Sequence, residues 1–268
     1  MNLFLKKKFK FLFFFRFFIA NLKFMSLFDL RKSRKNKLPK VFQIGFNRCG
    51  TTSLVKFMRL NGYTAVHWSA GRLSRGGTLA VGMELARREG KPLLTYIRRY
   101  DLYADMEKIN LERAINSLFA PRVFKRLRRR IGADEQVRPL YAYRYYKLLD
   151  EQYPGSRFIL NIRNIDEWVD SRLRFNDAKY RSCPHGDHYH ETEEELIDCW
   201  KSCWREHNQE VRDYFAERPK DLLIFDIRHD GPEKLVSFLP EFELNKEYWG
   251  RYNATNDVSS ESLIHSPE

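Results

Sequence analysis

The chain is predicted to be an α/β protein with a phosphate-loop-like parallel sheet, helices on both faces of the sheet and a basic helical insertion. Two observations predict this fold. Short apolar runs alternate with segments whose apolar residues recur at helical spacing, and such alternation is typical of parallel sheets covered by helices. The first apolar run also leads through a glycine-containing loop into a helix, as in phosphate-binding folds. The length of 268 residues suits one such domain.

The elements follow in order from hydrophobic periodicity and turn residues. Short apolar runs predict strands at residues 40–46, 63–68, 100–106, 158–162 and 222–227. Apolar residues three or four positions apart predict helices at residues 51–62, 78–90, 141–152, 165–175 and 193–215. Stop signals support two of these ends: Asn61-Gly62 closes the first helix and Gly90 the second. Residues 107–139 are strongly basic, and we expect them to form the helical insertion.

Composition divides the chain into four parts: a basic, Phe-rich leader at 1–24, a basic linker at 25–39, the α/β domain at 40–250 and a polar tail at 251–268. The leader carries too many charges for a spanning helix, which needs about 20 mostly apolar residues. It also lacks the cleavage site of a signal peptide. Two interpretations stay open: a basic helix lying in a membrane interface, or translated sequence upstream of a true start at Met25.

Charge and cysteine content narrow the partners and the compartment. The net charge of +13 favours an anionic partner such as nucleic acid, a membrane surface or a phosphorylated small molecule. Four cysteines are too few for a disulfide scaffold in a chain of this length. We therefore expect a reducing, cytoplasmic location, with peripheral membrane contact through residues 1–24 as an addition to it.

The first chemical signal is "FQIGFNRCGTTSL", residues 42–54. Gly45, four residues and then Gly50-Thr51-Thr52 match the frame G-x-x-x-x-G-K-[ST], except that Thr51 stands where the lysine belongs. Backbone N–H groups at the start of the following helix would form an anion pocket. Arg48 is the cation that the loop itself contains.

Two motifs in this order resemble the sulfotransferases that use 3′-phosphoadenosine 5′-phosphosulfate (PAPS). Their phosphosulfate loop has the form [KR]-x-G-T-T after an apolar strand, and "RCGTT" at residues 48–52 matches it. Their 3′-phosphate site is an Arg at a strand end and a Ser eight residues later, and Arg163 and Ser171 have that spacing. The resemblance runs from Lys40 to Ser171, more loosely to Leu239, and is closer to bacterial sulfotransferase-domain proteins than to the cytosolic animal enzymes.

The resemblance implies transfer of a sulfuryl group from PAPS to a hydroxyl or amine, with no metal required. It implies that the donor is bound by Arg48, Cys49, Gly50, Thr51, Thr52, Ser53, Arg163 and Ser171. Arg48 would stabilise charge on the bridging oxygen, by analogy with phosphoryl transfer. The chain departs from the animal enzymes at Ser53, where they carry an aromatic residue that stacks on adenine, and it lacks their K-G-x-x-G segment.

The acceptor must lose a proton, which requires a general base. Asp105, at the end of the third predicted strand, is our first choice because that strand end is expected beside the loop. Asp101 and His67 are alternatives. Capping of the next helix or pairing with a Lys would be purely structural roles for Asp105.

Two other patterns suggest metal chemistry. "LLIFD", ending at Asp226, has the shape of a Walker B strand and would fit a magnesium-dependent nucleotide kinase or ATPase. The missing loop lysine argues against that function. "CPHGDHYH" at residues 183–190, together with Cys199 and Cys203, could chelate zinc. Tryptophans beside both cysteines favour packing instead.

The basic segment "RVFKRLRRR", residues 122–130, also fits a binding module for nucleic acid or anionic lipid. It lacks the interleaved aromatic residues of a single-strand platform, so we expect no specific nucleic acid. In an enzyme it would recruit an acidic acceptor such as a polysaccharide or a lipid head group. The sequence does not otherwise define the acceptor. A salt titration of nucleic-acid binding, compared with a labelled sulfate-transfer assay, distinguishes a binding module from a sulfotransferase.

Overall fold

The computed structural model of the chain describes residues 38–69, 79–97, 99–109, 111–116, 122–132, 137–174 and 192–252. The expectations for the leader, for the start at Met25 and for the cluster at residues 183–190 lie outside these residues. All the elements below belong to one compact unit, Pro39–Glu268. In the part of the chain that the structure describes, no helix has both the length and the apolar character needed to cross a bilayer.

The centre of the fold is a five-stranded sheet with the order β2-β3-β1-β6-β7, in which all neighbours are parallel. Its strands are β1 Val41–Gln43, β2 Ala65–His67, β3 Leu102–Ala104, β6 Arg157–Ile162 and β7 Leu222–Asp226. Each lies inside a predicted apolar run or overlaps it closely, so the predicted α/β class is confirmed. Because the strands are parallel, their carboxyl ends share one edge of the sheet.

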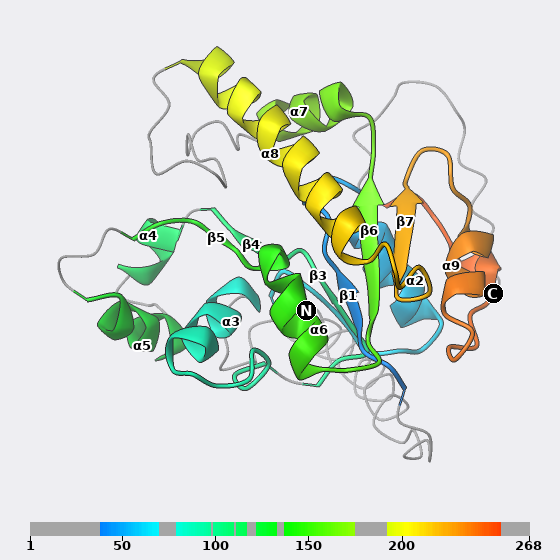
Figure 1. Ribbon diagram of the computed structural model, residues 1–268, viewed down its shortest axis with the longest axis horizontal. Helices are drawn as coiled ribbons and strands as arrows, with labels where there is room; N and C mark the ends of the chain where they lie inside the picture. The colour runs from blue at the N-terminus through cyan, green and yellow to red at the C-terminus, as the bar shows by residue number, and fades with distance from the viewer. Residues whose placement is uncertain are drawn as a thin grey trace, which may run out of the picture. The chain divides into compact units, whose positions relative to one another are not determined.

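Helices cover both faces of the sheet. Figure 1 shows α6 and α8 in front of it and α2 behind it. The helices are α2 Thr51–Leu60, α3 Leu79–Arg88, α6 Tyr146–Gln152, α7 Ile165–Arg174, α8 Glu193–Tyr214 and α9 Pro232–Phe238, with 3-10 turns η1 Ala142–Tyr145 and η3 Lys246–Tyr248. A capping box starts α8, where the Thr192 hydroxyl accepts a hydrogen bond from the Glu195 N–H (3.2 Å).

Aromatic side chains fill the core between the central strands and the front helices. The Phe42 ring of β1 lies 5.3 Å from that of Tyr103 in β3 and 5.6 Å from that of Phe158 in β6. Phe158 in turn packs on Phe215 at the end of α8, with 4.9 Å between the ring centres. These contacts hold β1 rigidly, and the loop that follows β1 therefore starts from a fixed position.

The insertion is not purely helical, which corrects the prediction. It contains α4 Leu111–Ile115 and α5 Arg122–Ile131, but also an antiparallel pair, β4 Glu107–Lys108 and β5 Leu140–Tyr141. Strands of two residues leave no readable period in a sequence. The insertion has its own apolar cluster, in which residues of α4 and α5 pack on Val81 and Leu85 of α3.

Candidate functional site

The β1–α2 loop, residues 44–50, leads into the uncapped N-terminus of α2 at the carboxyl edge of the sheet. Gly50 precedes α2 with φ 76° and ψ 19°, and a Cβ there would lie 2.8 Å from Cγ2 of Ile227, so only glycine fits. Arg48 also has a left-handed backbone, with φ 61°. The first turn of α2 has neither an acidic residue nor a side-chain cap. Its N–H groups are therefore free to bind an anion.

Two buried amides tie this loop to the sheet. Gln43 of β1 donates to Asn161 Oδ1 of β6 (2.5 Å) and to the carbonyl of Gly45 (2.6 Å). Asn161 donates to the carbonyl of Cys49 (2.5 Å), and Gln43 Oε1 accepts the N–H of Asp105 (2.8 Å). The amide pair thus fixes both ends of the loop and the turn that carries Asp105. Buried amides persist only when their hydrogen bonds are made, so the pair makes the geometry rigid.

Asn47 anchors the outer part of the loop. Its N–H donates to Glu107 Oε1 (3.1 Å), and its carbonyl accepts the indole N–H of Trp168 (3.1 Å). Its side-chain oxygen accepts from Arg172 (3.3 Å), a fully buried arginine whose guanidinium carbon lies 5.1 Å from the Trp168 ring centre and 4.7 Å from that of Trp200. The insertion and α7 therefore hold the outer part of the loop through Asn47.

The structure brings Arg163 to the loop. It follows β6 directly, and its guanidinium donates to the Arg48 carbonyl (3.1 Å) and to Glu167 Oε2 (2.7 Å). The same Glu167 oxygen accepts from Arg228 Nε (2.8 Å), and the hydrogen bond from Arg163, reinforced by Arg228, lowers the pKa of Glu167. Two guanidinium groups thus converge on one carboxylate oxygen. Ser171 lies on α7, half-buried, and none of its hydrogen bonds is seen among the described residues.

The carboxyl ends of β2 and β3 bring two candidate bases together. His67 Nε2 lies 3.0 Å from the Thr51 hydroxyl, 3.4 Å from that of Thr52 and 3.4 Å from Asp105 Oδ2. Asp105 therefore lies beside the helix start, as expected. Asp105 and Trp68 have left-handed backbones with φ 58° and 55°. Such conformations in non-glycine residues are costly and concentrate at functional sites.

Burial, together with the nearby charges of Arg59 and Arg48, lowers the pKa of His67 to about 4. The imidazole is therefore neutral at pH 7. It can accept a hydrogen bond from a threonine hydroxyl or donate one to the Asp105 carboxylate, depending on its tautomer.

This pKa predicts a specific titration. The His67 ring resonance, assigned by its loss in a His67→Gln variant, should titrate in an NMR experiment near pH 4 rather than near the ordinary 6.5. Because the unfolded chain binds this proton more tightly, His67 should lower the free energy of unfolding as the pH falls from 6.5 towards 4. A midpoint of about 6 or higher would contradict the desolvated environment described above.

Two aspartates considered from the sequence have structural partners. Asp101 precedes β3, at the opposite edge of the sheet, and accepts from the N–H and hydroxyl of Thr64 (2.7 and 2.8 Å), so its candidacy as the base is wrong. Asp226 does end β7, but its carboxylate accepts the Arg228 N–H (2.9 Å) and lies 3.1 Å from His229 Nδ1. Asp226 caps the turn after β7. No cluster of three or more metal-ligating side chains occurs within the described ranges.

The cysteines differ in state. Cys49, inside the loop, and Cys203 are buried thiols. Burial raises the pKa of the Cys49 thiol to about 12, so it is inert at neutral pH and contributes its backbone to the loop rather than a nucleophile. Cys199 is disulfide-bonded, so its thiolate cannot serve as a zinc ligand.

The C-terminal part of the chain reaches the start of α2. The Ser53 hydroxyl accepts the N–H of Tyr252 (3.0 Å), and Lys56 Nζ lies 4.0 Å from the centre of the Tyr252 ring. Trp249 packs edge-on against Phe57 of α2 at 5.4 Å. Ser53 is thus held by the backbone of a distant segment, at the position where the animal enzymes carry their adenine-stacking residue.

Sequence reasoning missed most residues that position the loop: Gln43, Asn47, Glu107, Asn161, Trp168, Arg172, His207 and Arg228. His207 of α8, for example, donates to the carbonyl of Ile44 (2.7 Å). A signal existed for Gln43 and Asn161, because each is a polar residue inside an apolar strand, and buried amides require partners. A sequence signal also existed for Arg228, because it follows β7, the strand that pairs with β6.

Comparison with known proteins gives one result. The family described as "Sulfotransferase domain" matches residues 40–257, which include every element from β1 to η3. No curated protein matches the chain.

Proposed function

We propose that this chain, which belongs to the sulfotransferase domain family, takes the sulfuryl group from PAPS and transfers it to a hydroxyl or amine acceptor without a metal ion. The observation that carries the proposal is the bare start of α2, with Arg48 in the loop before it and Arg163 bonded to the loop backbone. That arrangement offers two anion sites at one edge of the sheet, as a donor with a phosphosulfate and a 3′-phosphate requires.

The loop would hold the phosphosulfate. The backbone N–H groups from Cys49 to Ser53 and the hydroxyls of Thr51 and Thr52 supply donors at the positive end of the helix dipole. Gly50 allows the phosphate to approach the backbone closely. The Arg48 guanidinium would stabilise the bridging oxygen as it gains charge, which is the role that the lysine has in phosphate loops.

Arg163 and Ser171 would hold the 3′-phosphate, and the converging guanidiniums suggest Arg228 as a further ligand. Glu167 now occupies the point where Arg163 and Arg228 meet. Arg163 Nε is buried without a hydrogen-bond partner among the described residues, so it keeps a donor for an added oxygen atom. A dianionic phosphate would bind these groups through charge-assisted hydrogen bonds.

In the transfer step the acceptor oxygen or nitrogen attacks sulfur in line with the phosphate leaving group. The bond from sulfur to the bridging oxygen breaks, and adenosine 3′,5′-bisphosphate leaves with the electron pair. The acceptor proton passes to the Asp105 carboxylate. His67 lies between Asp105 and the donor loop and keeps the carboxylate oriented. His67 itself, neutral at pH 7, is the alternative base.

Arg163→Ala tests the nucleotide site. The change should weaken binding of adenosine 3′,5′-bisphosphate by about 2 to 4 kcal/mol, the loss typical of a charge-assisted bidentate contact. Binding of adenosine 5′-phosphate, which lacks the 3′-phosphate, should change little. Isothermal titration calorimetry measures both affinities.

Arg157→Ala is the matched control. Arg157 begins β6, at the opposite edge of the sheet, and pairs with Asp221 (3.3 Å) and Glu241 (2.7 Å). Its loss should leave both nucleotide affinities unchanged. Equal losses for the two nucleotides in Arg163→Ala would show that Arg163 is structural.

A further inference from the structure

We propose that the exposed face of α5 binds an anionic polysaccharide and that this polymer is the acceptor. This cationic face consists of Arg122, Lys125, Arg126, Arg129 and Arg130. The identification of the polymer as acceptor rests on the proposed function; the binding of the polymer does not.

The sequence of α5 separates two faces completely. The residues Val123, Phe124, Leu127 and Ile131 are at most 6% exposed and pack on the apolar cluster of the insertion. The five cations follow the spacing i, i+3, i+4, i+7 and i+8, which places them in one stripe on the other side. Along α5 this stripe extends for about 12 Å at a rise of 1.5 Å per residue.

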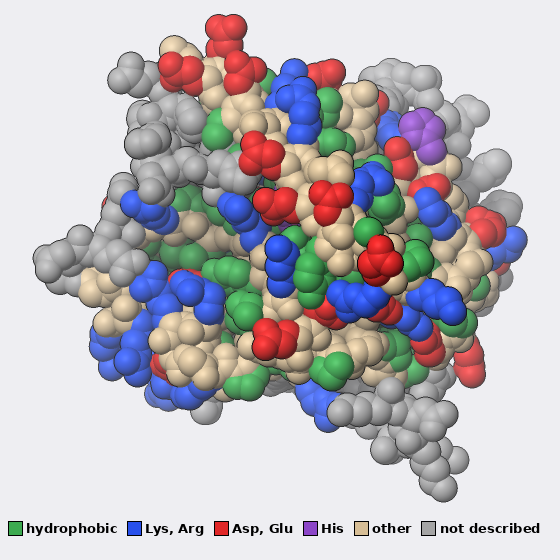
Figure 2. Space-filling view, viewed as in Figure 1, with side chains coloured by type: hydrophobic (Ala, Val, Ile, Leu, Met, Phe, Trp, Pro, Cys, Tyr) green, Lys and Arg blue, Asp and Glu red, His purple; other side chains and the backbone are tan. Residues whose placement is uncertain are grey.

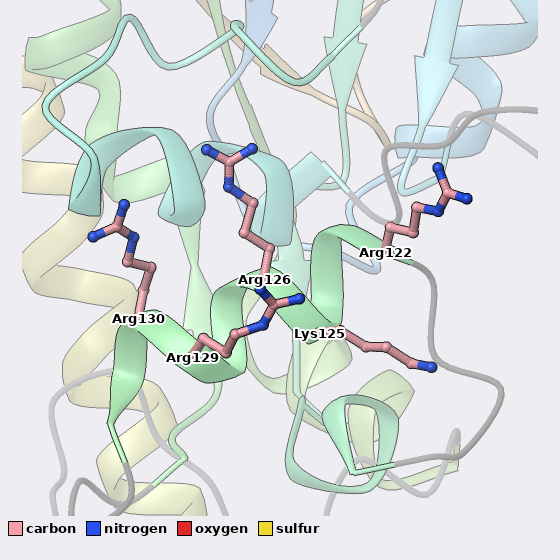
Figure 3. Close-up of a pocket in the computed structure, with 5 residues that line it drawn as sticks. All are labelled: Arg122, Lys125, Arg126, Arg129 and Arg130. Carbon is pink, nitrogen blue, oxygen red and sulfur yellow. The ribbon is translucent and has the colours of Figure 1, made fainter.

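The stripe lines a surface cavity and gathers charge on one part of the molecule. The same five residues line the cavity in Figure 3, and Figure 2 shows the corresponding basic area over α5. Arg126 pairs with Glu89 (2.7 Å), and Arg130 lies 3.6 Å from the same carboxylate. Arg122, Lys125 and Arg129 form no ion pair within the described residues, so the face has an excess of positive charge.

The place of α5 in the chain connects it with the acceptor. Its insertion begins two residues after Asp105, at Glu107 of β4, and Glu107 holds Asn47 of the donor loop. An acceptor that contacts both Asp105 and α5 would therefore have to be an extended polymer. Sulfuryl transfer would add a sulfate monoester, which is anionic, to such a polymer. Each transfer would then strengthen its attraction to the cationic face.

Two other polyanions fit less well. A membrane-surface helix needs apolar side chains to insert, and those of α5 are buried in the insertion. Single-stranded nucleic acid needs exposed aromatic rings between the cations, and the stripe has none. The nearby Tyr96 ring lies 5.2 Å below Arg126, and its hydroxyl binds Glu89. Planar guanidinium groups instead suit sulfate and carboxylate groups along a sugar chain.

The test compares two triple variants. One is Arg122→Ala with Lys125→Ala and Arg129→Ala, which removes no ion pair seen in the described residues. Its control is Arg205→Ala with Arg212→Ala and Lys220→Ala, which removes the same residue types from exposed positions on α8 and the turn after it. Affinity is measured for heparin, uncharged dextran, a DNA duplex, and vesicles of phosphatidylserine and phosphatidylcholine, after circular dichroism has confirmed folding.

The unmodified chain should bind heparin and not dextran. The α5 variant should bind heparin about tenfold more weakly or worse, while the control should stay within about twofold. Equal losses in the two variants would overturn the proposal, because only net charge would matter. The unmodified chain could instead bind the duplex or the vesicles as tightly as heparin, and the α5 variant could lose that affinity to the same extent. This result would overturn the polysaccharide proposal and identify nucleic acid or the membrane as the partner.

Nucleotide binding separates this proposal from the proposed function. The α5 variant should bind adenosine 3′,5′-bisphosphate as the unmodified chain does, since none of its three residues belongs to the donor site. Failure of the unmodified chain to bind that nucleotide would overturn the sulfotransferase mechanism. The heparin measurements would still decide whether the cationic face binds a polysaccharide.

Discussion

An Arg48→Ala variant is expected to turn over about a hundredfold more slowly than the unmodified chain, or slower still, at saturating PAPS and acceptor. In the proposed mechanism the guanidinium would stabilise charge that develops only as the sulfuryl group leaves. Affinity for adenosine 3′,5′-bisphosphate should fall less, because the loop N–H groups and Arg163 remain. Initial rates of transfer from labelled PAPS measure the first effect and calorimetry the second.

The left-handed backbone at Arg48 requires a control. Its φ of 61° is unfavourable for alanine and for most other residues but not for glycine. Arg48→Gly removes the guanidinium and relieves that strain, while the Arg48 carbonyl that binds Arg163 is kept. Both variants should therefore lose turnover alike. Near-normal transfer by either one at saturation is incompatible with the proposed role of Arg48.

The second large effect on turnover is expected for Asp105→Asn. Removal of a general base typically lowers turnover by about 10² to 10⁴. Asparagine has the same shape, tolerates the φ of 58°, and keeps the N–H that Gln43 binds. Donor affinity and stability should therefore change little. Single-turnover transfer rates and a calorimetric titration with adenosine 3′,5′-bisphosphate measure the two properties.

His67→Gln distinguishes the two candidate bases. If His67 only orients Asp105, its loss should reduce turnover by about tenfold and leave the shape of the pH–rate profile unchanged. Asp105→Asn should instead abolish the acid limb of that profile. The reverse pattern, with His67→Gln the more severe change, would assign the base to His67.

The strands and helices could be predicted because their cause is local. The four successive apolar residues that begin β7, Leu222–Asp226, and the periodic apolar residues of α8 are patterns among residues close together in the sequence. The order of the sheet, which pairs β1 with β3 and β6, is not local. It could be expected only from the rule that ligand loops gather at the carboxyl edge of parallel strands.

The site was predicted where chemistry and spacing coincide and missed where it depends on packing. Arg48 and Gly50 stand within one short motif. The support for that motif comes from Asn161, Trp168 and Arg172, more than a hundred residues away along the chain, which bond to the loop backbone or to Asn47. No period or spacing in the sequence predicts such contacts, because they depend on how the sheet and α7 pack together.

Isothermal titration calorimetry with adenosine 3′,5′-bisphosphate, in the absence of magnesium, against ATP with magnesium tests the central claim most directly. The two proposed anion sites, built around Arg48 and Arg163, predict tight binding of the bisphosphate that is unaffected by a chelator. ATP with magnesium should bind weakly and should not be hydrolysed. The account would be contradicted if the unmodified chain bound ATP with magnesium but not the bisphosphate, or if it hydrolysed ATP in a magnesium-dependent reaction. Either result would favour a nucleotide kinase or ATPase that uses Asp226.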